Sequence, residues 1–153
     1  HVTVMDTRED RLAFAVDGLG ADTSLFADAS AENEAMRMTG GDGFDVVIDA
    51  TGNAIPMQRG FNFLAHGARY VLLSVVRTDI TFSDPEFHKR EATLFASRNA
   101  QPDDFAEVVR QMEAGKVPTR ALNTHTGRLE DGVSLFNEWS RPEAGVIKAI
   151  LEV

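Results

Sequence analysis

The sequence predicts an α/β fold built on a doubly wound parallel sheet, and three observations support this. Two apolar runs without polar alternation, residues 45–50 and 70–76, are typical of strands covered on both faces. Residues 57–64 between them carry apolar side chains at helical spacing, which completes a strand–helix–strand unit. The chain also opens with a strand-like stretch, residues 2–5, that ends in an acid, Asp6, before a helix-like stretch.

The rest of the first half alternates in the same way. A helix is expected over residues 8–16 and is ended by the stretch 18–22. A weak strand at 23–26 follows, and then a short helix over 31–38 that stops at the glycine-rich run 40–43. Neither glycine run has the order of strand, glycines and helix that a phosphate-binding loop needs, so we interpret both as helix stops.

The second half departs from this alternation. Apolar residues at helical spacing predict helices over residues 105–112 and 133–139. Residues 92–96 predict an edge strand, and residues 117–125 resemble a loop. The closing residues 147–153 alternate between apolar and other side chains, which favours an antiparallel or edge strand over a buried parallel one.

One short helix and a boundary complete the expected organisation. Residues 83–86, Ser-Asp-Pro-Glu, resemble a capping box that opens a turn or two of helix through residue 90. The strand–helix alternation ends near residues 99–102, which is where a domain boundary is expected.

Composition excludes several classes of partner and site. With 24 acidic and 15 basic residues the net charge is −9, which argues against nucleic acid or an anionic membrane, because both require a basic face. No apolar run is long enough to span a membrane. The chain has no cysteine, so disulfides and thiolate zinc sites are excluded, and a cytoplasmic location is expected.

Asp6 is the most informative single residue. An acid at the tip of the second strand of a dinucleotide-binding fold accepts hydrogen bonds from the adenosine ribose hydroxyls and repels a 2′-phosphate, so the expected cofactor is NAD rather than NADP. The alternative is that Asp6 begins a turn or caps the following helix. The first strand and its glycine-rich loop would come before His1, so the predicted fold is a Rossmann-like sheet that lacks both.

Two further groups of residues are expected at a cofactor crevice, because ligands of a doubly wound sheet lie beyond the carboxyl ends of its strands. Ala50, Thr51 and Gly52 follow the first apolar run. Ser74 and Val75 stand near the end of the second.

The histidines suggest no metal site. His88 and Glu91 are three residues apart, but a solvated charged turn is the favoured interpretation. His125 lies in a polar stretch where it is either structural or lines a cleft. No nucleophile–histidine–acid set and no carboxylate pair stands out, so no catalytic or metal-binding residue is assigned.

With these features in place, the chain resembles the medium-chain, zinc-type alcohol and polyol dehydrogenases. The matching segments occur in the family's order over nearly the whole chain. They are VTVMD (2–6), RL (11–12), GAD (20–22), DVVIDATG (45–52), GARYVLL (67–73), KREATL (89–94), TH (124–125), LED (129–131) and KAILEV (148–153).

The resemblance implies a set of cofactor contacts. Asp6 and Arg11 would hold the adenosine ribose. Val75 would contact the nicotinamide carboxamide through its backbone, and Lys148 would approach the pyrophosphate. Ser74 stands where the family often has glycine. The expected cofactor-binding residues are Asp6, Arg11, Ala50, Thr51, Gly52, Ser74, Val75 and Lys148.

The resemblance also implies an organisation and a reaction. Residues 1–100 would form an incomplete NAD-binding Rossmann domain, and residues 101–153 would complete the catalytic domain of a longer parent enzyme. The parent would oxidise a secondary alcohol, a polyol or sugar acid, by hydride transfer to NAD. Its zinc would be bound by cysteine, histidine and acidic ligands of an amino-terminal domain, and no part of that domain is in this chain. A homo-oligomer is expected, with the strand near residues 92–96 pairing with its twofold copy.

Loss of the central strand would leave two facing sheet edges unpaired. We therefore expect a chain that is inactive alone and does not fold independently. Three alternatives remain open at the level of sequence: a non-catalytic nucleotide-binding module, a methyltransferase-type Rossmann-like domain, and a structural or interaction domain.

Overall fold

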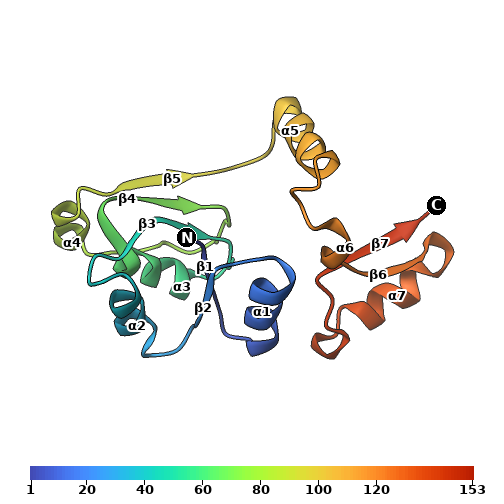
Figure 1. Ribbon diagram of the computed structural model, residues 1–153, viewed down its shortest axis with the longest axis horizontal. Coiled ribbons are helices and arrows are strands. Elements are labelled where there is room, and N and C mark those ends of the chain that lie inside the picture. The colour runs from blue at the N-terminus through green and yellow to red at the C-terminus, as the bar shows by residue number, and fades with distance from the viewer. The chain divides into compact units, whose positions relative to one another are not determined.

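The computed structural model describes all residues from 1 to 153 and divides into two compact units (Figure 1). The first contains residues 1–12 and 22–100, and the second contains residues 13–21 and 101–153. All four strand pairings in the two units are parallel, which confirms the predicted α/β class with parallel sheets.

The first unit begins with a parallel pair of strands, β1 (Thr3–Asp6) and β2 (Thr23–Phe26), in which Thr3 lies opposite Thr23 and Asp6 opposite Phe26. Between them, α1 (Glu9–Ala13) continues as a single π-helical turn, η1 (Phe14–Gly18). The expected helix over 8–16 is therefore present, but its carboxyl end is underwound into a wider π-helical turn.

A second, three-stranded sheet has the order β3–β4–β5. Its strands are β3 (Phe44–Asp49), β4 (Leu64–Leu72) and β5 (Thr93–Ala96). The β1–β2 pair makes no ladder with this sheet, so the parallel strands of the first unit form two sheets rather than one.

Four helical segments accompany these strands. They are α2 (Ala31–Met38), α3 (Ala54–Arg59), the 3₁₀ turn η2 (Gly60–Phe63) and α4 (Asp84–Lys89). Ser83 precedes α4, but its side chain makes no capping hydrogen bond, so the predicted capping box is wrong although the helix is present. Pro85 in the first turn fits the helix start without such a cap, because that turn has no partner for its N–H groups.

The second apolar run differs from its expected strand. Residues 70–76 were expected to be extended, whereas β4 begins earlier, at Leu64, and ends at Leu72. Ser74 and Val75 therefore lie beyond the strand rather than within it. Hydrophobicity continues past the strand end, which is why pattern alone overestimates its length.

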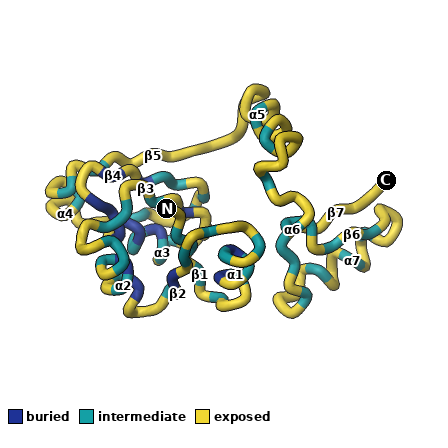
Figure 2. The backbone as a smooth tube through the Cα atoms, viewed as in Figure 1, coloured by how far each residue is buried: buried dark blue, intermediate teal, exposed yellow.

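The core of the first unit surrounds α3, η2 and β4 (Figure 2). Two clusters of buried residues form it, and Val47 of β3 packs against both. One contains Phe61, Leu64, Ala65, Ala68 and Tyr70, and the other contains Leu25, Ala31, Ala35 and Phe63. The strand–helix–strand unit thus supplies the first cluster, as the sequence pattern predicts, whereas β2 and α2 supply most of the second.

The second unit consists of short helices and one parallel strand pair. Its elements after residue 100 are α5 (Pro102–Glu113), α6 (Thr119–Leu122), β6 (Asn123–Arg128), η3 (Leu129–Asp131), α7 (Gly132–Trp139), η4 (Pro142–Ala144) and β7 (Lys148–Glu152). The predicted helices over 105–112 and 133–139 are present. No residue from 101 to 153 is buried.

Two expectations for this unit are wrong. Residues 117–125 contain α6 and the start of β6 rather than a loop. The segment Asn-Thr-His-Thr-Gly-Arg carries no apolar alternation, and its extended form depends on pairing with β7, which the local pattern does not reveal. The closing strand β7 pairs parallel to β6, so the antiparallel alternative is excluded, while its position in a two-stranded sheet makes it an edge strand as expected.

Candidate functional site

The carboxyl ends of β3, β4 and β5 lie level with one another in the first unit. Asp49 at the end of β3 is opposite Leu72 of β4, which is opposite Ala96 of β5. The ladder continues one residue further, because Leu73 donates its N–H to the Asp49 carbonyl at 2.9 Å and Ser97 donates to the Leu72 carbonyl at 2.9 Å. The segments that follow these strands therefore leave the sheet at one edge, where ligands of parallel sheets bind.

Asp49 organises the first of these segments. Its side chain is buried, with 7% of the residue exposed, and its Oδ1 accepts hydrogen bonds from the Thr51 N–H at 3.0 Å and the Thr51 hydroxyl at 3.0 Å. Asn53 then caps α3, since its Oδ1 accepts the Ile55 N–H at 3.0 Å. These local bonds fix the backbone between β3 and α3, so that the turn is shaped before any ligand is present.

Gly52 lies at the tip of this turn, close to the segment that follows β4. Its φ is +64°, in the left-handed region where a side chain is strained, and a Cβ at this position would lie 4.0 Å from the Ser74 Oγ. The structure thus brings Thr51, Gly52 and Ser74 together from two neighbouring strand ends. Ala50 and Val75 flank them and are exposed.

Asp6 ends β1 and begins a turn. Its Oδ1 accepts the Arg8 N–H at 2.9 Å, and its backbone carbonyl accepts the Ala27 N–H at 2.9 Å. The turn-forming alternative weighed for Asp6 is therefore present in the structure. It engages one carboxylate oxygen, which is compatible with a ribose contact through the other, and that contact stays a prediction.

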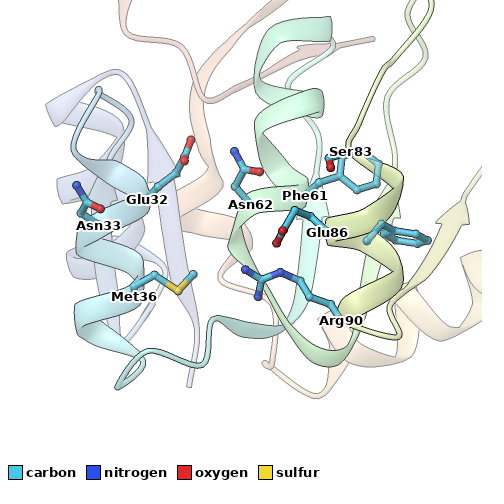
Figure 3. A pocket seen from close by; sticks show the side chains of 9 residues that line it. Glu32, Asn33, Met36, Phe61, Asn62, Ser83, Glu86 and Arg90 are labelled. Carbon is cyan, nitrogen blue, oxygen red and sulfur yellow. The ribbon is translucent and has the colours of Figure 1, made fainter.

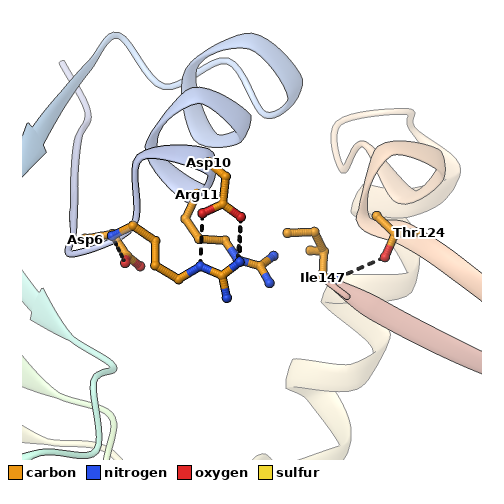
Figure 4. A network of polar contacts seen from close by, with 6 residues as sticks. Asp6, Asp10, Arg11, Thr124 and Ile147 are labelled. Carbon is orange, nitrogen blue, oxygen red and sulfur yellow. Dashed lines mark hydrogen bonds and ion pairs between the residues drawn. The ribbon is translucent and has the colours of Figure 1, made fainter. Parts of the chain in front are cut away.

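A charged cluster follows Asp6 directly (Figure 4). Arg8 donates to both oxygens of Asp10, from Nε at 2.9 Å and from Nη2 at 2.6 Å, and the Nε of Arg11 lies 4.0 Å from the same carboxylate. The hydrogen bond from Arg8, more than its charge, holds the pKa of Asp10 below its ordinary value, and the same bond raises the pKa of Arg8. Arg8 thus uses its Nε–Nη2 edge to bind Asp10 beside the predicted ribose-binding acid.

Lys148 belongs to the second unit, as the first residue of β7. Its carbonyl accepts the Thr124 hydroxyl at 3.2 Å, and Thr124 Oγ1 also accepts the Ile147 N–H at 3.0 Å (Figure 4). These bonds anchor the start of β7 to β6. The pyrophosphate contact expected for Lys148 stays a prediction.

The residues of this chain do not fit a zinc site. No group of three or more histidine, cysteine, aspartate or glutamate side chains lies close enough together to hold a metal ion. Glu91 has its ion pair with His66, at 3.3 Å, rather than with His88 on the same stretch of chain. We therefore assign no zinc-dependent step to the residues of this chain.

A hollow of about 360 Å³ opens elsewhere in the first unit, between α2 and α4 (Figure 3). Acidic, amide and arginine side chains face it together with Met36 and Phe61. None of the predicted cofactor-binding residues lines it: the lining residues are Glu32, Asn33, Met36, Phe61, Asn62, Ser83, Glu86, Phe87 and Arg90.

Sequence reasoning missed two residues, Asp49 at the end of β3 and Asp10 in α1. The signal for Asp49 was available, because an aspartate two residues before a threonine commonly closes a local side-chain turn. The pairing of Asp10 with Arg8 is two residues apart in sequence and depends on how the chain bends between β1 and α1, which the spacing does not specify.

The comparisons with known proteins show the family and the fold of this chain. The model of the zinc-binding dehydrogenase family matches residues 1–114. The L-galactonate-5-dehydrogenase of Escherichia coli K12 is 43% identical over 101 residues, which cover 64% of this chain and 30% of that protein. An alcohol dehydrogenase of Cupriavidus necator is 27% identical over 158 residues, which cover 99% of this chain and 42% of that protein.

Solved structures show the same fold. The 2R,3R-butanediol dehydrogenase of Bacillus subtilis superposes with a TM-score of 0.87 at 18% identity, over 99% of this chain and 43% of that one. An alcohol dehydrogenase of Escherichia coli CFT073 in complex with NADH gives a TM-score of 0.87 at 20% identity, over 99% and 44%.

The chain spans less than half the length of these relatives. None of its helices combines the length and the apolar character needed to cross a membrane. The family match covers most of the sequence and confirms the resemblance inferred from its segments, in preference to a methyltransferase-type domain. The chain belongs to the zinc-binding dehydrogenases, the medium-chain, zinc-type family of oxidoreductases.

Proposed function

We propose that this chain is the cofactor-binding part of an NAD-dependent dehydrogenase that oxidises a secondary alcohol, a polyol or sugar acid, by hydride transfer. The observation that carries the proposal is the set of strand ends in the first unit, where Asp6 closes β1 and Thr51, Gly52 and Ser74 meet beyond β3 and β4. Relatives named for galactonate, xylulose and erythritol favour the polyol and sugar-acid class.

Each residue has a distinct part in the proposed site. Asp6 and Arg11 bind the adenosine ribose, with Asp6 contributing the oxygen that the Arg8 N–H does not use. Gly52 allows the cofactor to approach the backbone, since no side chain projects there. Val75 offers its backbone to the nicotinamide carboxamide, and Lys148 offers a positive charge to the pyrophosphate.

Bound NAD would supply the hydride acceptor, and this chain would supply its position. We propose that the zinc ligands lie in the part of the longer relatives that this chain does not span, and that this part activates the alcohol. We therefore propose that residues 1–100 act as a Rossmann-type cofactor domain and that residues 101–153 complete a catalytic domain. By itself the chain would not turn over alcohol.

Assembly and location extend the proposal. The strand β5 has β4 on one side only, and Leu94 and Phe95 on it are 40% and 47% exposed. We propose that β5 pairs with a second copy of itself to make a homo-oligomer. A cytoplasmic location stays a prediction.

Titration calorimetry of the full chain with NAD⁺ tests the proposed site. Asp6→Asn keeps an acceptor for the Arg8 N–H but removes the charge and one ribose acceptor, so we expect the affinity for NAD⁺ to fall by about tenfold. Asp45→Asn makes the same chemical change at an exposed position near the amino end of β3 and serves as the control. Absence of NAD⁺ binding to the wild-type chain, or an equal loss in both variants, would contradict the proposal.

A further inference from the structure

We propose that Asp10 is a positioning residue that selects against 2′-phosphorylated dinucleotides by occupying the Nε–Nη2 edge of Arg8 beside the predicted ribose-binding acid. The inference rests on the proposed function, because it assigns the cofactor preference of the same site. It adds a residue that does not itself contact the cofactor: Asp10 acts through Arg8 and, more weakly, through Arg11.

Without Asp10, Arg8 would be available to bind a 2′-phosphate. Its N–H is bonded to Asp6 Oδ1 at 2.9 Å, which fixes its backbone beside the acid expected to bind the ribose hydroxyls. A guanidinium presents a planar fork of donors that matches phosphate oxygens in pairs, so an arginine at this place is a natural partner for a 2′-phosphate.

The structure shows that this fork is already occupied. Both Arg8 donors on one edge, Nε and Nη2, bond the two oxygens of Asp10 at 2.9 and 2.6 Å, which is a bidentate pair (Figure 4). Arg11 Nε lies 4.0 Å from the same carboxylate. A phosphate could bind the Nε–Nη2 edge of Arg8 only by displacing a carboxylate two residues away in the same chain, whose local concentration is high.

Charge acts in the same direction as geometry. The stretch from Asp6 to Arg11 contains three carboxylates and two guanidiniums, so its net charge is negative before any ligand arrives. A 2′-phosphate would add about two further negative charges near Asp6. Because the hydrogen bond from Arg8 holds the pKa of Asp10 below its ordinary value, Asp10 stays ionised and paired throughout the neutral range.

The test measures the affinities of the full chain for NAD⁺ and NADP⁺ by titration calorimetry. In Asp10→Ala, Arg8 is released and the local charge becomes neutral, so the ratio of NADP⁺ to NAD⁺ affinity should rise by about tenfold, the worth of one charge-assisted hydrogen bond. Glu9→Ala removes the same charge from the neighbouring exposed residue, whereas the ion pair of Arg8 is with Asp10, and should leave the ratio unchanged. Asp10→Glu, which can still pair with Arg8, should restore the wild-type ratio.

The double variant Arg8→Ala/Asp10→Ala separates positioning from simple charge. If Asp10 acts through Arg8, the gain in NADP⁺ affinity disappears in the double variant. A second readout is the Arg8 Nε–H signal in nitrogen-15 NMR, which should be slow to exchange in the wild type and in Glu9→Ala and fast in Asp10→Ala.

The outcomes distinguish this inference from the function it rests on. Tight NAD⁺ binding with an unchanged NADP⁺ to NAD⁺ ratio in Asp10→Ala would overturn the inference and leave the proposed site intact. A gain that persists without Arg8, or that Glu9→Ala reproduces, would overturn it as well. Failure of every variant and of the wild type to bind either dinucleotide would overturn both.

Discussion

At the scale of single residues, Tyr70 shows how one polar group is accommodated in the core. Its side chain is fully buried, its hydroxyl donates to the Met57 carbonyl at 2.7 Å, and its ring meets Phe61 edge-on at 4.8 Å. Gly60 makes room for it, because a Cβ there would lie 2.1 Å from the Tyr70 hydroxyl oxygen. Burial, and to a smaller extent the charge of Asp49, raises the pKa of Tyr70 above its ordinary range.

The buried hydroxyl makes stability depend on alkaline pH. The pKa of Tyr70 is raised on folding, so its contribution is complete below the unfolded value of about 10 and is lost as pH rises above it. Tyr70→Phe should lower the free energy of unfolding at pH 7 by about 1–2 kcal/mol, because the Met57 carbonyl loses its partner. Above pH 10, the free energy of unfolding of this variant should fall less steeply with pH than that of the wild type. Urea denaturation between pH 7 and 11 measures both effects.

Ser83→Ala provides the control for that prediction. It also deletes a hydroxyl, but one that makes no capping bond, so its free energy of unfolding should stay within about 0.5 kcal/mol of wild type at every pH. Parallel pH profiles for wild type and Tyr70→Phe would show that the buried phenol does not set the alkaline limit.

At the scale of elements, β5 offers a defined edge. The Ser97 N–H bonds the Leu72 carbonyl, and because N–H groups alternate in direction along a strand, the N–H of Phe95 points toward β4 and that of Leu94 points away from it. The outer side of β5 therefore presents unpaired backbone groups beside exposed Leu94 and Phe95. Such an edge is suited to pairing with another strand.

Leu94→Pro should dissociate a β5-mediated dimer while leaving the protomer folded. Proline at this position removes an N–H that faces outward, so the β4–β5 ladder is kept. Phe95→Pro removes an N–H that faces β4 and should instead destabilise the protomer itself. Sedimentation velocity gives the oligomeric state and circular dichroism gives the folded fraction; a dimer that survives Leu94→Pro would exclude β5 as the interface.

At the scale of the whole molecule, the chain leaves much apolar surface and several strand edges without partners. In the first unit β1 pairs only with β2, and β3 pairs only with β4. In the second unit the apolar positions of the helices are open, with Phe105 65%, Phe136 72% and Val133 83% exposed. Apolar surface that stays exposed leaves less buried area to offset the entropy of folding.

We therefore expect these 153 residues alone to give a broad, weakly cooperative thermal transition and to self-associate. Scanning calorimetry combined with light scattering tests this, with the full-length Cupriavidus necator alcohol dehydrogenase under the same conditions as a control. A monodisperse monomer that melts in one sharp transition would contradict the expectation and show that the two sheets of the first unit suffice.

The predictable parts of the fold are those whose signal is local or periodic. The apolar run that becomes β3, the amphipathic spacing of α5 and the glycine stops each depend on residues close in sequence, and each element is present. At the site, the pattern predicted that Thr51 and Gly52 follow the first apolar strand and that Ser74 lies near the end of the second, and the structure brings Gly52 and Ser74 together. Whether they bind a cofactor stays a prediction.

The parts that resisted prediction depend on partners remote in sequence. The polar strand β6 is extended because β7 pairs with it, and the end of β4 is set by its neighbours rather than by its own hydrophobicity. The capping hydrogen bond predicted for Ser83 is absent, because the sequence pattern permits this bond without requiring it. The engagement of Arg8 by Asp10 arises from the bend between β1 and α1.

The α/β class, the family and the order of the elements in the first unit follow from the amino-acid sequence, because they depend on the spacing of apolar residues and on segments that match in order. Only the tertiary structure decided that the parallel strands of the first unit form two sheets, and that β6 and β7 run parallel. Strand pairing joins backbone groups that carry no side-chain identity, so the pairing of β1 with β2 alone is settled only when the chain is folded. The pairing of Arg8 with Asp10 is settled at the same stage, because it depends on the bend of the chain between β1 and α1.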